Sequence, residues 1–317
     1  MLQQFGHPVV WHRRYHVIHR KIWLLGMVLA TAALSSCTYW GRCVDGTGPV
    51  LEEVRETGNF TGLRNTGSFD VYVSQSDDFS VLVRAQESLI PIIETNVSGS
   101  TLVIEIRDNT CIRSSSNIEV HVTMPETEEL TLNGSGRVFA DMLSSAEVEI
   151  TNSGSGNMEI DSTLSEYLVI DNSGSGSIEV DDSHTDYLDI IQSGSGSIQC
   201  DNVIGPAEAD IRHSSSGRIS AVILDVPELY AMISGSGRIE LTGYGAYAEY
   251  ALSSSGRIDA FDMEMLEVDA TNSGSGNIYL WASELLDATI TGSGDIVYMG
   301  NPQLNIRVTG SGNVRPY

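Results

Sequence analysis

Lysine is almost absent from this chain of 317 residues, since Lys21 is its only lysine. Four of the 17 basic residues lie within the first 21 positions, which leaves 13 arginines to balance 42 Asp and Glu residues. A surface this acidic repels phosphate backbones and argues against nucleic acid as a partner. Aromatic residues are also scarce, at 7%, whereas glycine numbers 31, a composition unlike that of an ordinary globular enzyme.

Long apolar runs are lacking too. The longest near the N-terminus, Ile22–Leu34, is too short to cross a bilayer core of about 30 Å. It follows the basic pair Arg20 and Lys21 and leads into Leu-Ser-Ser-Cys37, an order typical of a secretory signal that ends in a lipobox. We therefore predict a lipoprotein signal peptide over 1–36.

On this interpretation Cys37 carries the lipid that holds the protein on a membrane, and residues 37–52 form a lipidated tether. The alternative is an ordinary N-terminal anchor helix. Thr38 stands where an inner-membrane retention signal places Asp, which favours the outer membrane. We expect an exported, membrane-anchored lipoprotein that faces either the cell surface or the periplasm.

Only four cysteines are present, and export permits disulfides among those beyond Cys37. We favour a Cys43–Cys111 pair. Cys200 falls in an inward-facing column of the repeat described next, which predicts a buried small apolar side chain.

A Gly-Ser-Gly-x-[Ile/Val/Met] unit recurs ten times at intervals of 18 to 21 residues. Ser215 and Ser254 replace its first glycine, so that position tolerates a Cβ atom. The second glycine of the ten units stands at Gly136, Gly156, Gly176, Gly196, Gly217, Gly237, Gly256, Gly276, Gly294 and Gly312. Such self-similarity is the signature of a repeat architecture.

Apolar residues alternate at period two on both sides of each unit, as Ile178 and Val180, or Leu168 and Ile170, illustrate. Each repeat is thus expected to hold two or three strands of four to six residues. Such a repeat cannot bury its own apolar face, but copies stacked every ~4.8 Å bury a continuous core. The predicted fold is all-β: a single-stranded right-handed parallel β-helix, its handedness taken from the chirality rule.

Domain boundaries follow from the same repeat. We expect about ten regular rungs over 126–317 and an irregular β N-terminal cap with the first rungs over 53–125, both in one continuous domain. A glycine at each corner suits a turn that needs positive φ and close backbone approach. The intervening serines should form a hydrogen-bonded structural ladder, and His213, which aligns with Asn152 and Asn172, should belong to a polar ladder and not act as a base.

The segments Phe60-x-x-Leu63 and Phe69-Asp70-Val71-Tyr72-Val73, with Cys37 and the Gly-Ser-Gly units, resemble the head GIN domain family of auto-transporter adhesin-like lipoproteins, common in Bacteroidetes. The resemblance covers roughly residues 53–315. It implies a β-helical head, whose right-handedness it supports, and an adhesive surface role. The family supplies no catalytic residues that could be carried over.

A column of carboxylates offers one further chemistry. Asp141, Asp161, Asp181 and Asp201 each stand five residues after a unit glycine and would stack about 4.8 Å apart. Calcium takes carboxylate oxygens readily, so calcium bridging is one hypothesis. The simpler interpretation is that each Asp caps a turn and faces water.

We expect no enzyme, no obligatory cofactor and no nucleic acid partner. The favoured function is a non-catalytic envelope-anchored lipoprotein, an adhesin-like or scaffold β-helix that binds an unknown polysaccharide or protein. Two alternatives stay open: a carbohydrate-active β-helix enzyme, which the even rung length and missing lysine disfavour, and a calcium-stabilised module that self-associates laterally, with Arg137, Arg218, Arg238 and Arg257 beside the acidic columns.

Overall fold

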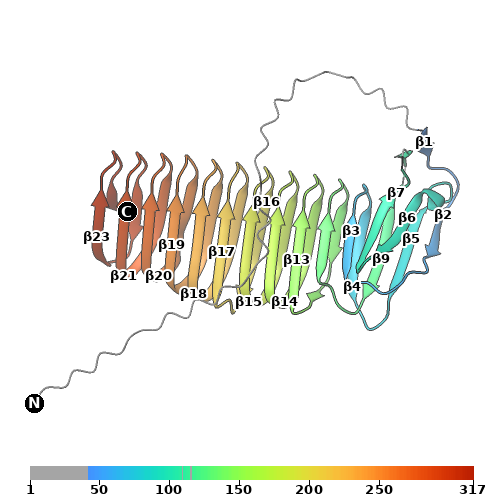
Figure 1. Ribbon diagram of the computed structural model, residues 1–317, viewed down its shortest axis with the longest axis horizontal. Coiled ribbons are helices and arrows are strands. Elements are labelled where there is room, and N and C mark those ends of the chain that lie inside the picture. The colour runs from blue at the N-terminus through green and yellow to red at the C-terminus, as the bar shows by residue number, and fades with distance from the viewer. Residues whose placement is uncertain (1–41, 109, 115) are drawn as a thin grey trace, which may run out of the picture. The chain divides into compact units, whose positions relative to one another are not determined.

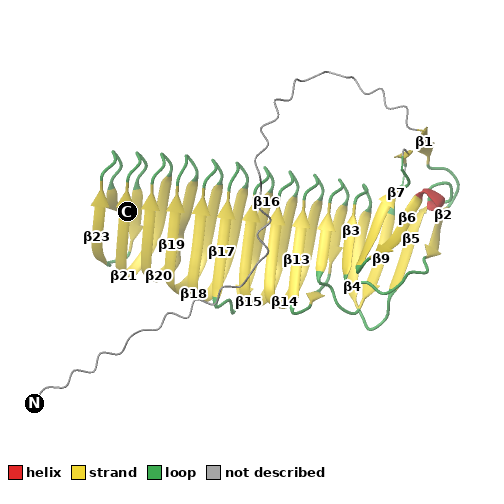
Figure 2. Ribbon diagram, in the orientation of Figure 1, coloured by secondary structure: helices red, strands yellow, loops and turns green. Residues whose placement is uncertain are grey.

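The computed structural model describes residues 42–108, 110–114 and 116–317, and these form 24 strands and one short 3-10 helix. Figures 1 and 2 show the strands stacked in successive coils, with the loops in a row along one edge. The predicted fold class, an all-β parallel β-helix, is confirmed. The expected signal peptide and Cys37 lie outside the described residues. Within those residues, no helix has the length and apolar character needed to cross a membrane.

The coils repeat because residues 20 positions apart pair in parallel. Between β14 (Asn157–Asn172) and β15 (Ser177–Gln192), Met158 lies opposite Ile178 and Leu168 opposite Leu188. Alternate side chains point inward, and these four are at most 2% exposed. Each coil therefore adds one layer to a continuous apolar core, as the period-two pattern predicted.

The strands are longer than the sequence indicated. β14 and β15 are each 16 residues long, whereas we expected four to six. The difference arises because ladder pairing continues through the bends, as between Thr163 and Ser183. In the coils of β14 and β15 and in four later coils, only the Gly-Ser-Gly corners interrupt the strand, whereas three other coils have a second break, for example between Ile204 and Glu208.

The remaining strands of the regular coils follow in chain order. They are β10 (Glu129–Leu132), β11 (Arg137–Ala140), β12 (Leu143–Ser144), β13 (Glu147–Asn152), β16 (Ser197–Ile204), β17 (Glu208–His213), β18 (Arg218–Ile233), β19 (Arg238–Leu252), β20 (Arg257–Asn272), β21 (Asn277–Ile290), β22 (Ile296–Met299), β23 (Gln303–Val308) and β24 (Val314–Pro316).

Large and small side chains alternate between neighbouring coils at one place in the core. Tyr250 is fully buried, and its partners in the adjacent coils are Ala231 and Ala270. The small alanines leave room for the ring. Its hydroxyl, however, has no hydrogen-bond partner among the described residues, and burial raises the pKa of Tyr250.

The cap is an insertion between the first two coils. The first coil comprises β3 (Gly62–Asn65) and β4 (Asp70–Gln75), and it pairs in parallel with β10 and β11 although residues 76–128 separate them in sequence. The inserted chain continues the stack on the other side of the first coil. There β7 (Thr101–Ile106) pairs with β3, and β9 (Glu119–Met124) pairs with β4.

Antiparallel strands then close this end of the core. β5 (Ser80–Gln86) pairs antiparallel with β9 and with β2 (Val50–Val54), while β6 (Ile93–Ser98) pairs antiparallel with β7. The 3-10 helix η1 (Ile90–Ile92) lies between β5 and β6 and buries Ile90 and Ile92. The irregular alternation of apolar residues before the repeats predicted strands here but not this antiparallel pairing.

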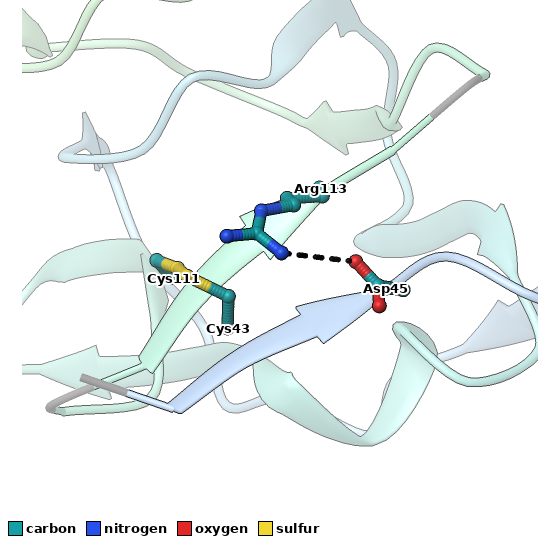
Figure 3. Close-up of a disulfide and its surroundings, with 4 residues drawn as sticks. All are labelled: Cys43, Asp45, Cys111 and Arg113. Atoms are coloured by element: carbon teal, nitrogen blue, oxygen red, sulfur yellow. Dashed lines mark ion pairs between the residues drawn. A yellow bond between two sulfur atoms is a disulfide. The ribbon is translucent and has the colours of Figure 1, made fainter. Parts of the chain in front are cut away.

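A disulfide links the two-stranded sheet of β1 (Arg42–Asp45) and β8 (Thr110–Arg113). Cys43 and Cys111, the pair that the sequence favoured, are bonded, with their Cα atoms 4.3 Å apart (Figure 3). The segment expected to be a tether, 37–52, therefore contains β1 and the start of β2, so it joins the fold from residue 42 onward.

At the other end, β23 and β24 form the last coil. Leu304 and Ile306 continue the inward columns, yet they are 42% and 45% exposed because no described coil covers them. Pro316 pairs with Tyr298 and offers no N–H to a further strand, as expected for a blunted edge.

Candidate binding groove

The Gly-Ser-Gly turns stack directly on one another. A Cβ atom built on Gly176 would overlap the carbonyl oxygen of Gly156 in the preceding coil, and the same contact recurs along the row, for example at Gly276 against Gly256. None of the ten second glycines has positive φ. Close backbone approach, and not the positive φ that we also expected, is therefore what requires glycine here.

A buried asparagine stabilises three of these ten turns from inside. Asn172, which is 0% exposed, donates from Nδ2 to the Gly176 and Ser197 carbonyls at 2.9 and 3.1 Å, and its Oδ1 accepts from the Gly174 N–H at 3.1 Å. Asn152 and Asn272 repeat the pattern. Each amide thus ties its own turn to the next coil.

His213 occupies the same column. It is 2% exposed, its Nε2 donates to the Gly217 carbonyl at 2.7 Å, and its Nδ1 accepts from the Ser215 N–H at 3.2 Å. Burial lowers the pKa of His213, which fits a neutral ring. Because both nitrogens serve the turn, His213 replaces an asparagine, in line with the polar-ladder interpretation.

The middle serines of the turns behave differently from our expectation. Their side chains are exposed, and no hydrogen bond among the described residues uses the hydroxyls of Ser175, Ser195, Ser216, Ser236 or Ser255. The predicted hydroxyl-to-hydroxyl ladder is therefore wrong for these five coils. The middle residue of each turn projects away from the coil, so its hydroxyl faces solvent and remains free to bind.

Next to this row of serines stands a row of arginines. Ser197, Arg218, Arg238 and Arg257 lie opposite one another in four successive coils. Arg238 contacts Glu240 at 2.9 Å, and Arg257 contacts Asp259 at 2.6 Å. Arg218 has no ion-pair partner within the described part of the chain, because Ser220 stands where Glu240 stands one coil later.

Together the two rows line a shallow groove of about 750 Å³ along the axis of the solenoid. It spans the turns Ser175–Ser177, Ser195–Ser197, Ser216–Arg218, Ser236–Arg238 and Ser255–Arg257, and Asn157 lies at one end. All lining residues are Ser, Gly, Asn or Arg. The groove therefore presents hydroxyls and positive charge in a chain that is otherwise strongly acidic.

The four aspartates of the predicted column, Asp141, Asp161, Asp181 and Asp201, are all exposed. The residue before each of them pairs with its counterpart in the next coil, so the four follow one another in successive coils. Among the described residues, Asp181 and Asp201 form a cluster with Glu179 in which one carboxylate oxygen of each lies within 4.8 Å of the others. Burial, followed by the charges of Asp181 and Asp201, raises the pKa of Glu179. Calcium binding at this column stays a prediction.

Cys200, the one cysteine of the described residues outside the disulfide, lies in the core. It is 1% exposed, opposite Val180 and Ala221, and burial raises the pKa of its thiol to about 12. The thiol is thus a small core side chain, as its inward column predicted.

An elongated all-β solenoid with a polar groove along its turns belongs to the repeat proteins, whose extended surfaces bind extended partners. The family model described as "Putative auto-transporter adhesin, head GIN domain" matches residues 59–220 and 186–302, and the chain belongs to this family. No curated protein matches the chain.

The solved structures that match the chain include three from the genus Parabacteroides. One, titled a putative lipid binding protein from Parabacteroides distasonis, is 24% identical with a TM-score of 0.49 and covers 87% of this chain and 100% of its own. A putative adhesin from the same organism is 20% identical (TM-score 0.44, 87% and 100% covered). A putative adhesin from Parabacteroides merdae is 18% identical (TM-score 0.49, 87% and 99% covered).

Sequence reasoning missed two features of this edge. An earlier turn of the same kind is formed by Asn65-Thr66-Gly67-Ser68-Phe69. Gly134 of the next coil lies against the Gly67 carbonyl of this turn, and Asn65 makes the same buried amide contacts as the later asparagines. Because Phe69 stands in place of the second glycine, this turn does not match the Gly-Ser-Gly pattern in the sequence. The groove was also missed, although the serines and arginines were both noted. The two rows are aligned by the pairing register between strands, which the sequence does not show.

Proposed function

We propose that this protein is a non-catalytic, envelope-anchored adhesin-like lipoprotein that binds an extended partner along its solenoid. The groove over the turns of five successive coils carries this proposal. It runs along the axis and does not close into a cleft, so it suits a polymer or an elongated segment better than a small substrate. The adhesin family to which the chain belongs supports a surface or exported location.

A lipid on Cys37 would hold the cap end near the membrane. Only four residues separate Cys37 from β1, and an extended chain of that length reaches no more than about 18 Å. The disulfide between β1 and β8 would then link the lipidated N-terminal segment covalently to the cap. The coils would extend away from the membrane with the groove accessible along their turns.

The groove residues favour binding over catalysis. Glycoside hydrolysis typically needs two carboxyl groups on opposite sides of the scissile bond. The groove lining contains no carboxylate, histidine or cysteine. His213 and Cys200, two other reactive side chains of the coils, are buried in the solenoid.

Protease treatment of intact cells tests the location. We expect the protein to be cleaved on whole cells and Cys37→Ser to move it from the membrane to the soluble fraction. Protection until the outer membrane is opened would contradict surface adhesion and favour a periplasmic scaffold. Membrane retention of Cys37→Ser would remove the lipoprotein claim.

A further inference from the structure

We propose that the groove binds a linear acidic polysaccharide of the uronic acid type, whose carboxylates pair with the arginine row and whose hydroxyls bond to the serine row. This inference rests on the proposed function and specifies its ligand class. The evidence for it comes from the groove residues defined above, first of all Arg218, Arg238 and Arg257.

The arginine row contains one arginine, Arg218, whose charge no carboxylate among the described residues balances. Like charges directly opposite on neighbouring strands destabilise a sheet, and Arg218, Arg238 and Arg257 occupy three consecutive coils. Arg212, on another face, shows the usual solution, since it contacts both Asp189 and Asp210. Arg218 lacks any such partner among the described residues, so an external anion is the natural counter-charge.

Arg238 and Arg257 keep donors for a ligand as well. Each of their ion pairs uses a single guanidinium nitrogen, Nη1 of Arg238 and Nη2 of Arg257. A guanidinium has five N–H donors in a fork that matches a carboxylate. Stacking over the Tyr279 ring, 4.0 Å from its centroid, fixes the position of the Arg257 guanidinium.

The serine row indicates a sugar polymer in preference to a protein segment. Unbonded hydroxyls of Ser175, Ser195, Ser216, Ser236 and Ser255 recur once per coil, beside glycines that leave the floor of the groove flat. Protein partners usually offer apolar anchors that need pockets, whereas this lining contains no apolar side chain. A polymer with hydroxyls and one charge per unit matches a row that repeats both.

The acidity of the whole chain does not prevent this binding. Exposed charges are largely screened beyond about 8 Å at physiological ionic strength. A bound chain would therefore respond to the arginines beside it more than to carboxylates on other faces of the solenoid. The same screening predicts that binding weakens as salt is added.

Affinity electrophoresis tests the proposal with the protein purified from membranes in detergent. Native gels contain either polygalacturonate or the neutral polymer hydroxyethylcellulose, and EDTA is present so that calcium cannot bridge polygalacturonate to the aspartate column. We expect retardation by polygalacturonate alone. Arg218→Gln should weaken it about fivefold, and the triple variant with Arg238→Gln and Arg257→Gln about 100-fold.

Two further variants keep the result interpretable. Arg307→Gln removes the same charge from an exposed arginine outside the groove that has no ion-pair partner among the described residues, and should bind as the unchanged protein does. Ser197→Asp places a carboxylate opposite Arg218 without replacing any arginine, and should weaken retardation at least as much as Arg218→Gln does. Circular dichroism confirms that each variant is folded.

Equal retardation of the triple variant and Arg307→Gln, or equal retardation by the neutral polymer, would overturn the proposal. These outcomes are independent of the proposed function, because the gels do not depend on location. Cells that still adhere through a protein without affinity for polygalacturonate would refute the ligand class only. A protein that binds polygalacturonate but resists protease on intact cells would refute surface adhesion only.

Discussion

Replacing Gly176 by Ala tests how closely the coils stack. The new Cβ would meet the Gly156 carbonyl oxygen far inside the 3.0 Å that real Cβ contacts essentially never cross. Backbone atoms form this contact, so no side chain can rotate away to relieve it. Since Gly176 does not have positive φ, alanine adopts its backbone conformation without strain, and the whole effect comes from this clash.

The cost can be estimated from the bonds between the two turns. Moving the coil away from its neighbour stretches the bond from Ser175 N to Gly154 O (3.0 Å) and the bond from Gly174 N to Asn152 O (3.0 Å), and the longer contact from Asn152 Nδ2 to Ser177 O (3.3 Å). At about 1 kcal/mol for each bond, plus some lost packing, Gly176→Ala should lower the free energy of unfolding by about 2–4 kcal/mol.

Two matched variants separate this effect from that of any glycine replacement. Gly58→Ala adds a Cβ with nothing within 4 Å and should change stability by less than about 0.5 kcal/mol. Gly174→Ser also places a Cβ against a backbone oxygen, that of Gly154, but serine already stands at this first-glycine position in two other coils, so the variant should cost less than Gly176→Ala.

Urea unfolding followed by circular dichroism measures all three. The reasoning is refuted if Gly176→Ala unfolds at the same urea concentration as Gly58→Ala. That result would mean that the turns are not in contact across coils, and the groove built on them would have no floor.

Three other perturbations test single side chains and the disulfide. Tyr250→Phe removes a hydroxyl that has no partner and should raise the free energy of unfolding by about 1 kcal/mol, measured in urea. His213 is held neutral, so its contribution is complete above about pH 6.5 and is lost as the pH falls and the unfolded chain takes up a proton; His213→Asn should flatten the stability profile on the acid side. Reducing the Cys43–Cys111 disulfide, which spans 68 residues, should destabilise the cap by at most about 4 kcal/mol, seen as earlier proteolysis of that end.

Each of these has a result that contradicts it. If Tyr250→Phe were less stable than the unchanged protein, the Tyr250 hydroxyl would have a hydrogen-bond partner and the first prediction would be wrong. An unchanged acid sensitivity in His213→Asn would show that His213 takes up a proton as readily in the folded state as in the unfolded chain. Equal protease resistance with and without reductant would show that β1 and β8 hold the cap without the disulfide.

The coil and its inward columns could be predicted from the sequence because every contact that defines them joins residues about 20 positions apart. Ile178 packs against Met158 and Ile198, and all three stand two residues after a unit glycine. In such a fold the repeat in the chain is the repeat in space. The polar column with His213 was predictable for the same reason, since asparagines mark the position in other coils.

The cap followed a different rule. β3 and β10 are neighbours in space although residues 66–128 lie between them, and no periodicity connects the two. The antiparallel pairing of β5 with β2 and β9 depends on which edges the returning chain leaves open. Alternation identified these strands but could not assign their partners, because it records which face is buried and not what lies beside it.

The sequence by itself determined the all-β repeat, its core columns and the glycine corners, because one local pattern repeated ten times leaves only one way to bury its apolar face. Tertiary structure decided the order of coils around the cap, the solvent-facing serine hydroxyls and the missing carboxylate beside Arg218. These features depend on register between strands and on where side chains from different coils end, which a linear pattern does not contain. The groove is the product of both.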